Sequence, residues 1–326
     1  MLIISIYATA QKNENINTYI KQGIALNDSG KYSEAVAKYK KALDIDPQNL
    51  QVQYELSYTL VISGKPKEAI PFLERVAISN TNPEAYNLLA SIYDDTNDFE
   101  RSFAYYKSGI VAFPKCSQLY LNLGISYLRQ KKYPEAELIS IEAIKSNPKH
   151  ASNQRIYALA NYYQDKFEIS LLAWCGFILL EPHTKRSQEG YRYIQKIINN
   201  GITRNSNKSV NINVSSNGLK SEYLSLPLAV LGATDNKKNL SEIDSLSLQL
   251  TSVFKIYKEI EENKNPQTFF SVFYAKYFGK LAQSLNMPAF ARLISLNTSE
   301  SAKWIVENPK KMEDLNRWIE VTDRSF

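Results

Sequence analysis

The chain has 326 residues, with 39 basic and 33 acidic side chains and a formal net charge of +6. This length fits two ordinary domains or one solenoid with an appended module, and 44% hydrophobic residues suffice for a buried core, which excludes a disordered chain. Only 11 glycines and 12 prolines argue against collagen-like and many-turned β architectures. Two cysteines exclude a disulfide scaffold, and two histidines leave little material for a metal centre or a catalytic triad.

The first ten residues, MLIISIYATA, carry an incomplete export signal. Ala8-Thr9-Ala10 has the form that signal peptidase cleaves, but a positive n-region is missing and the apolar stretch at 2–7 is short. We expect residues 1–10 to be a truncated signal peptide and the protein to be exported to the periplasm or envelope of a Gram-negative bacterium. The alternative is a complete, uncleaved N-terminus on a cytoplasmic protein. No segment is long and apolar enough to predict an integral membrane span.

A period near 34 residues runs from residue 16 to residue 184. Large apolar residues recur at places 4, 7, 11 and 24 of most units, small residues at places 8 and 20 of all five, and proline at place 32 of four. Spacings of three and four put the large residues on one face of a helix, and the small residues let two antiparallel helices approach closely. Five units in phase begin at Ile16, Leu50, Pro83, Ser117 and Ala151. The clearest unit contains Tyr120, Leu123, Gly124, Tyr127, Ala136, Ala143 and Pro148, at places 4, 7, 8, 11, 20, 27 and 32.

This pattern resembles the tetratricopeptide repeat family over residues 16–184, about half of the chain. The resemblance implies an all-α fold: a right-handed α-solenoid of about five helix pairs, in which stacked neighbours bury the apolar face that no single unit can bury alone. Residues 186–200 have Tyr191 and Ile194 on an apolar face but lack a small residue at the next place 8. We therefore expect a capping helix there, so that the solenoid with its cap takes residues 16–200.

The resemblance also implies a partner-binding groove. In the family, places 2, 5, 9, 12 and 13 of each first helix line the concave surface, where apolar and aromatic residues are candidate anchors for a peptide or a partner helix. Ile20 and Ile24 stand where the chaperone-tail subclass has Lys and Asn, so a clamp for a terminal carboxylate is not expected. The alternative is that the C-terminal residues fill the groove themselves. The predicted groove residues are Tyr54, Tyr58, Ile62, Asn87, Ser91, Asp94, Asp95, Leu121, Ile125, Arg129, Arg155, Leu159, Tyr162 and Tyr163.

The rest of the chain is predicted to be a linker and a second, smaller helical module. Residues 201–218 are rich in Asn, Ser and Gly, with at most a short strand where Val210, Ile212 and Val214 alternate with polar residues. Residues 219–326 show helical patterns without the repeat, and no family is recognised in them. The positive surplus lies after residue 184 but is spread out, which favours a solvated surface, so no nucleic-acid partner is expected.

Motifs for chemistry are weak throughout the sequence. The aspartates at 94, 95 and 98 match a diphosphate-binding pattern of isoprenoid synthases, but they fall at an inter-helix turn, where Asp and Asn are common. His150 and His183 have no Cys, His or acidic residue at metal-ligand spacing. No GxxxxGK[ST], GxSxG, HExxH or CxxC pattern is present. The sequence therefore predicts no catalytic residue, no metal and no cofactor.

The function that the sequence favours is a non-catalytic scaffold that binds a partner protein or peptide in the concave groove, in the cell envelope. One alternative is an enzyme whose site lies in residues 219–326, which predicts paired carboxylates in a cleft there. Another is an envelope-docking module in the same residues. The sequence does not indicate an oligomeric state.

Overall fold

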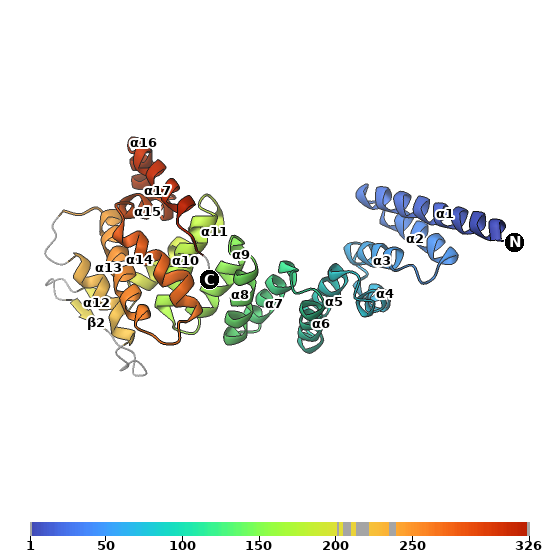
Figure 1. The fold of residues 1–326 in the computed structure, drawn as a ribbon, viewed down its shortest axis with the longest axis horizontal. Coiled ribbons are helices and arrows are strands. Elements are labelled where there is room, and N and C mark those ends of the chain that lie inside the picture. The colour runs from blue at the N-terminus through green and yellow to red at the C-terminus, as the bar shows by residue number, and fades with distance from the viewer. Residues whose placement is uncertain (1, 201, 205–209, 213–221, 235–238, 325–326) are drawn as a thin grey trace. The chain divides into compact units, whose positions relative to one another are not determined.

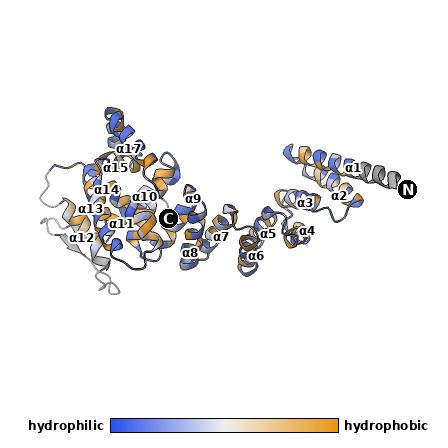
Figure 2. Ribbon diagram, viewed as in Figure 1, coloured by the Kyte–Doolittle hydropathy of each residue, from blue (hydrophilic) through white to orange (hydrophobic). Residues whose placement is uncertain are grey.

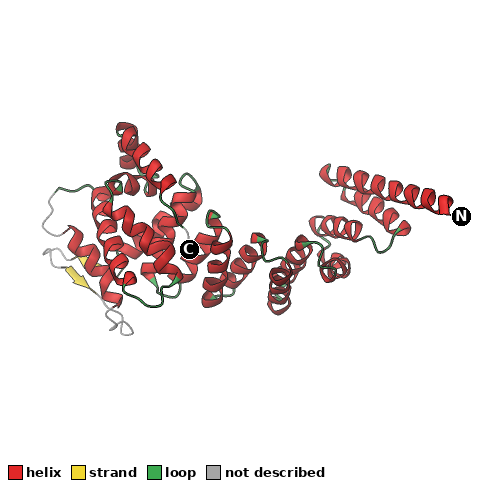
Figure 3. Cartoon of the chain, in the orientation of Figure 1, coloured by secondary structure: helices red, strands yellow, loops and turns green. Residues whose placement is uncertain are grey.

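The computed structural model describes residues 2–200, 202–204, 210–212, 222–234 and 239–324 (Figure 1). Within this part the chain is helical apart from one short hairpin (Figure 3). It divides into two compact units, Met1–Ser126 and Tyr127–Phe326, here called the N-terminal and C-terminal units.

The N-terminal unit consists of helix pairs, as the 34-residue period predicts. Blue and orange residues alternate along these helices in Figure 2, which is the amphipathic pattern of a repeat that buries one face of each helix. The pairs are α1/α2, α3/α4 and α5/α6, and the unit boundary falls within α7. The bounds are α1 Leu2–Asp28, α2 Tyr32–Ile45, α3 Leu50–Ile62, α4 Pro66–Ile78, α5 Pro83–Asp95, α6 Phe99–Ala112 and α7 Ser117–Arg129.

Close approach within a pair depends on the small residues. Gly23, at place 8 of the first unit, lies against the fully buried ring of Tyr39 at place 24, and a Cβ on Gly23 would come within 2.5 Å of that ring's Cε1 atom. Gly30 ends the first helix of this pair with a φ of +73°, in the left-handed region that favours glycine. The residue types at these places therefore set both the spacing of the helices and the turn between them.

The C-terminal unit completes the repeats and adds further helices. Its helices were expected from sequence as an end to the array followed by a helical module, and this fold class is confirmed. The bounds are α8 Tyr133–Ser146, α9 Ala151–Tyr162, α10 Phe167–Leu180, α11 Lys185–Ile198, α12 Glu222–Thr234, α13 Glu242–Glu262, the π-helix η1 Ser271–Ala275, α14 Lys276–Gln283, α15 Met287–Ile294, α16 Ser299–Glu307 and α17 Pro309–Val321.

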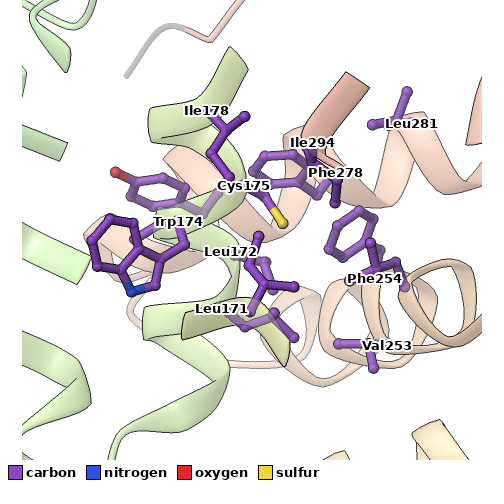
Figure 4. Close-up of a cluster of buried hydrophobic side chains, with 14 of the residues drawn as sticks. Leu171, Leu172, Trp174, Cys175, Ile178, Val253, Phe254, Phe278, Leu281 and Ile294 are labelled. Carbon is purple, nitrogen blue, oxygen red and sulfur yellow. The ribbon is translucent and has the colours of Figure 1, made fainter. Parts of the chain in front are cut away.

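Helix α10 lies at the centre of this unit's core. Its residues 170–178 are all buried, because the run LLAWCGFILL has no polar face. Trp174 stacks on Tyr193 of α11 with ring centroids 4.9 Å apart. On the opposite side of α10, Leu172 and Cys175 face Phe254 of α13 and neighbouring side chains of α14 and α15 (Figure 4).

The last repeat and the C-terminal helices thus share one hydrophobic core. The compact units divide at Ser126 and Tyr127, whereas the sequence placed a linker at 201–218. The last repeat belongs to the same compact unit as the C-terminal helices because α10 is apolar around its circumference and has to be covered on both sides. A compact unit is not the same as an independently folding domain. The predicted domain boundaries therefore stay predictions: 1–10, 16–200, 201–218 and 219–326.

Helix α11 caps the repeats in the way that its apolar face predicts. Tyr191, Ile194 and Ile197 are buried, and Thr184 and Ser187 form a capping box at its N-terminus. Gly190 supplies the small residue that the repeat count did not find, because a Cβ there would lie 2.9 Å from the ring of Trp174. Counted from residue 185, where a sixth unit would begin, Gly190 is at place 6 instead of the usual place 8.

The predicted short strand has a partner in the structure. Strand β1, Ile202–Arg204, pairs antiparallel with β2, Val210–Ile212, in the register Ile202 to Ile212. Val214, the last member of the predicted alternation, lies outside the described residues. Strand β1 was not predicted, because three residues are too short to show a period of two.

Candidate functional site

Several exposed apolar residues of the N-terminal unit lie on the first helices of its repeats, at places 9 and 13. We call the residues at places 5, 9 and 13 of α1, α3 and α5, with their acidic neighbours, the first-helix face. On it Tyr58 is 42% exposed, Ile62 40% and Ile24 37%, and Tyr54 is half-buried. A spacing of four residues keeps these places on one side of a helix.

The opposite side of the same helices explains why this face stays outward. In α3, Val52, Leu56 and Leu60 are buried against neighbouring helices. Val52, Leu56 and Leu60 follow the same spacing as Tyr54, Tyr58 and Ile62, shifted by two residues, so the two sets lie on opposite sides of one helix. Tyr58 and Ile62 are therefore not required by the packing of the repeat.

Hydrogen bonds join neighbouring first helices along this unit. Thr59 Oγ1 of α3 donates to Asn27 Oδ1 of α1 at 3.1 Å. Ser126 Oγ of α7 donates to Asp94 Oδ1 of α5 at 2.6 Å. Both bonds link place 10 of one repeat to place 12 of the repeat before it. This ladder joins α1 to α3 and α5 to α7, and so helps to fix the spacing of the exposed residues within each of these two helix pairs.

Two of the predicted groove residues serve this ladder. Asp94 is 7% exposed and accepts the hydrogen bond from Ser126, and Asn87 Oδ1 accepts one from Asn122 Nδ2 at 2.7 Å. Of the other predicted groove residues in this unit, Ser91 and Leu121 are half-buried, while Asp95 is exposed and Ile125 is 42% exposed. The structure thus leaves Tyr54, Tyr58, Ile62 and Ile125 as the accessible apolar members.

Carboxylates surround the aromatic residues of the first-helix face. Burial raises the pKa of Glu55, and the nearby charge of Asp28 raises it further. Burial also raises the pKa of Tyr54 to about 12, with smaller contributions from Glu84, Glu55 and Tyr58. Among the described residues no lysine or arginine forms an ion pair with Asp28, Glu55 or Glu84. The face therefore combines apolar anchors with three carboxylates that no described lysine or arginine pairs.

This crowding predicts a pH-dependent effect of replacing Glu55. A raised pKa in the folded state means that the folded protein binds more protons than the unfolded one, so stability is lost as pH rises through that pKa. Glu55→Gln cannot ionise and should be more stable than wild type at pH 7, by about 0.5 kcal/mol after allowance for solvent screening. The difference should vanish below about pH 3.5. Thermal unfolding at both pH values, with exposed Glu14→Gln of α1 as the control, checks it; an equal gain at both pH values would mean that ionisation of Glu55 is not the cause.

The predicted groove residues of the C-terminal unit are largely engaged within the protein. Arg155 forms a two-pronged ion pair with Glu189 of α11, with Nη2 2.8 Å from Oε2. Leu159 is 8% exposed and belongs to the core. Tyr162 packs edge-on against Tyr193, also of α11, with ring centroids 4.7 Å apart. The capping helix therefore covers much of this part of the predicted groove.

Two predicted residues of this unit keep surface. Tyr163 is 50% exposed, although its ring stacks on Tyr133 at 5.0 Å, and Arg129 is exposed. Sequence reasoning placed the residues on the right helices but did not foresee the cover by α11. The residues that could have indicated this cover are Glu189 and Tyr193, which lie four residues apart and so share one face of α11. Glu189 is opposite in charge to Arg155, and Tyr193 is an aromatic partner for Tyr162.

The aspartate-rich turn has a structural role. Asp98 is the N-cap of α6 and accepts from the backbone N–H of Arg101, and Asn97 adopts a φ of +61°. Within the described part of the chain, no three His, Cys, Asp or Glu side chains group as a metal site requires. Cys116 and Cys175 are not bridged, and no described helix is long and apolar enough to cross a membrane.

Two family models match the chain, and both are described as tetratricopeptide repeat. One matches residues 26–92 and the other residues 87–151. None of the curated protein sequences matches it.

Several solved structures are similar to part of the chain at low sequence identity. The crystal structure of MamA protein is 21% identical, with 52% of this chain and 93% of that chain covered and a TM-score of 0.47. YrrB, described as a TPR protein with an unusual peptide-binding site, is 17% identical, with coverage of 57% and 97% and a TM-score of 0.47. PilF of Pseudomonas aeruginosa is 18% identical, with coverage of 58% and 90% and a TM-score of 0.43.

Proposed function

We propose that this chain, a member of the tetratricopeptide repeat family with matches over residues 26–151, is a non-catalytic scaffold. In this proposal it binds a partner protein or peptide on the first-helix face. The observation that carries the proposal is the exposure of Tyr58 and Ile62 at places that the repeat does not use for its own packing. Clustered aromatic and aliphatic side chains of this kind are the usual anchors of a protein interface.

The charge of the face indicates the chemistry of the partner. Asp28, Glu55 and Glu84 lie beside the apolar anchors without a cation of their own among the described residues. A segment with apolar side chains and lysine or arginine would bury the anchors and supply the missing charge. We therefore propose a basic amphipathic segment as the occupant, and place the interaction in the cell envelope on the strength of the Ala8-Thr9-Ala10 pattern.

The test is capture of the partner by the full chain from separate periplasmic and cytoplasmic fractions, followed by affinity measurement with the purified partner. Tyr54→Ala/Tyr58→Ala should weaken binding at least tenfold, about 1.4 kcal/mol, because it removes two central anchors. Wild-type binding should also weaken in about 0.5 M salt, which screens the carboxylates.

The matched control is Ile78→Ala/Val111→Ala. These side chains are 79% and 83% exposed on the second helices α4 and α6, so they test whether any exposed apolar residue captures the partner. The control should bind like wild type, and circular dichroism should show both double variants folded. A partner held equally by both variants would move the binding surface away from the first-helix face, and a partner found only in the cytoplasmic fraction would refute the envelope location.

A further inference from the structure

Arg324, which follows the end of α17, inserts its guanidinium group into a socket of four aromatic rings in the C-terminal unit. Its Cζ atom lies 4.3 Å from the ring centroid of Tyr277 and 5.4 Å from that of Phe273, and the rings of Tyr274 and Phe278 complete the socket. Ring faces attract a cation at such distances. The scaffold function makes no use of this group of residues.

The rings of the socket are held by contacts that do not involve Arg324. Tyr274 of η1 stacks on Tyr157 of α9 with ring centroids 5.5 Å apart. Phe278 of α14 packs against Phe254 of α13 with ring centroids 4.8 Å apart. Because close-packed side chains of this kind stay in place, we expect the socket to persist when the guanidinium group leaves it.

The last repeat presents a hydrogen-bond acceptor to the socket. Gln154 Nε2 of α9 donates to the carbonyl oxygen of Pro148 at 2.8 Å, and Gln154 Oε1 accepts from Arg324 Nη1 at 3.4 Å. Gln53 holds the same place 4 in the second unit and donates to the carbonyl oxygen of Pro47 at 2.8 Å. Its buried Oε1 has no partner within the described part of the chain. The repeat therefore offers this acceptor with or without an arginine beside it.

A glycine makes room for the guanidinium group next to this acceptor. A Cβ on Gly176 of α10 would lie 2.5 Å from Gln154 Oε1 and 3.2 Å from Arg324 Nη2. Any side chain at this position would thus crowd both the acceptor and the cation. A glycine inside a helix costs about 1 kcal/mol relative to alanine, so its presence in α10 fits a need for this space.

Arg324 is a poorly satisfied ligand of the socket that it fills. Its hydrogen bond to Gln154 is long, and its buried Nε and Nη2 have no partner among the residues that the structure describes. The buried hydroxyl of Tyr274 lacks a partner there too. Asp323 is exposed, and no backbone hydrogen bond holds Asp323 or Arg324 within the described ranges. One side chain therefore holds this end of the described chain in place.

We propose that the socket is a binding site for a guanidinium group, that Arg324 fills it as an internal ligand, and that a guanidinium group from outside competes with it. A guest that is not tethered at this point of the chain can turn until its N–H groups reach the side-chain oxygens of Gln154 and Tyr274. The guest can be the arginine side chain of a partner protein or a free small molecule, since the same chemistry recognises both. The site is independent of the first-helix face, so either proposal can fail without the other.

The test uses full-length Arg324→Ala and two probes of the same shape, ethylguanidinium and ethylurea, in titration calorimetry. Ethylguanidinium replaces the atoms that the substitution removes beyond Cβ. It should bind the variant at least tenfold more tightly than ethylurea does, because the ring faces prefer a cation. It should also bind the variant at least tenfold more tightly than it binds wild type, in which Arg324 occupies the socket. Equal binding in either comparison, or no binding to the variant at about 10 mM, would overturn the proposal.

A control variant and a folding measurement keep the result decisive. Arg317→Ala removes an exposed arginine of α17 and should bind ethylguanidinium no more tightly than wild type does. If this control binds as tightly as Arg324→Ala, the probe does not report the socket and the site is refuted. If circular dichroism shows Arg324→Ala unfolded, about 10 mM ethylguanidinium should restore the helical signal and ethylurea should not. Failure of both probes to restore it would also refute the site.

A third probe distinguishes the sources of the guest. Blocked arginine, N-acetylarginine methylamide, carries the guanidinium group on a peptide backbone. If it binds Arg324→Ala as tightly as ethylguanidinium does, the result would support the arginine side chain of a partner protein. Binding at least tenfold weaker would support a free small cation.

Discussion

Phe278→Ala is expected to lower the free energy of unfolding of the C-terminal unit by about 3–5 kcal/mol. Phe278 is fully buried where α14 meets α13 and α15, with the ring centroids of Phe254 and Phe290 at 4.8 Å and 5.9 Å. Removal of the ring leaves a cavity among three helices that can relax only in part. Because the same core includes α10, the loss should destabilise the last repeat together with the C-terminal helices.

The tryptophans make this measurable, because all three lie in the C-terminal unit. In a Trp304→Phe/Trp318→Phe background, the fluorescence of Trp174 reports α10 alone. Urea unfolding should then show Phe278→Ala shifting the Trp174 transition to lower urea. Leu285→Ala, at a position that is 98% exposed, should change stability by less than about 0.5 kcal/mol. If the Trp174 midpoint is unchanged in Phe278→Ala, the last repeat and the C-terminal helices are separate cooperative units.

The parts of the fold that could be predicted from sequence are those fixed by contacts within one repeat or between adjacent ones. Gly23 against Tyr39 is such a contact, with both partners at fixed places of one unit. A helix start outside the repeats could be predicted from residues close in sequence: Ser241 caps α13 and accepts from the backbone N–H of Asp244, three residues on. Contacts between fixed places of a repeat recur in every unit, so the 34-residue period of the sequence reveals them.

The cover on α10 could not be predicted in this way. Its partners, Phe254 and Phe278, lie about 80–100 residues further along the chain, in a region without a repeat. The apolar run of α10 needs cover on all sides, but it carries no information about which segment supplies that cover. Long-range pairing of this type depends on the shapes of both surfaces, and one sequence shows neither.

The candidate site shows the same division. Tyr54, Tyr58 and Ile62 were predicted as accessible residues and lie together on α3. Asp94 was predicted beside them, but Ser126 draws its carboxylate into the ladder between repeats. The acidic character of the face was missed, because Asp28, Glu55 and Glu84 stand on three different helices and only folding brings them near Tyr54. The enzyme alternative predicts paired carboxylates in a cleft of residues 219–326, and that stays a prediction.

A second large effect is expected at Arg324, whose guanidinium group is held by rings rather than by a carboxylate. It lies 4.3 Å from the ring centroid of Tyr277 and 5.3 Å from that of Phe278. Nη1 donates to Gln154 Oε1 at 3.4 Å, while the buried Nε and Nη2 have no partner within the described residues. Burial lowers the pKa of this guanidinium below its usual value. The attraction of the ring faces must therefore offset the loss of hydration.

Arg324→Met and Arg324→Glu should consequently have opposite outcomes. Methionine matches the apolar part of arginine and carries no charge to desolvate, so it should keep or raise the free energy of unfolding, by up to about 2 kcal/mol. Glutamate would place an unpaired carboxylate against negative ring faces, and should lower it by more than about 3 kcal/mol. Arg317→Glu, on the exposed side of α17, should stay within about 0.5 kcal/mol of wild type. Urea unfolding of the three variants decides the cause, because a methionine variant as unstable as the glutamate variant would mean that a polar partner, and not the rings, holds Arg324 in place.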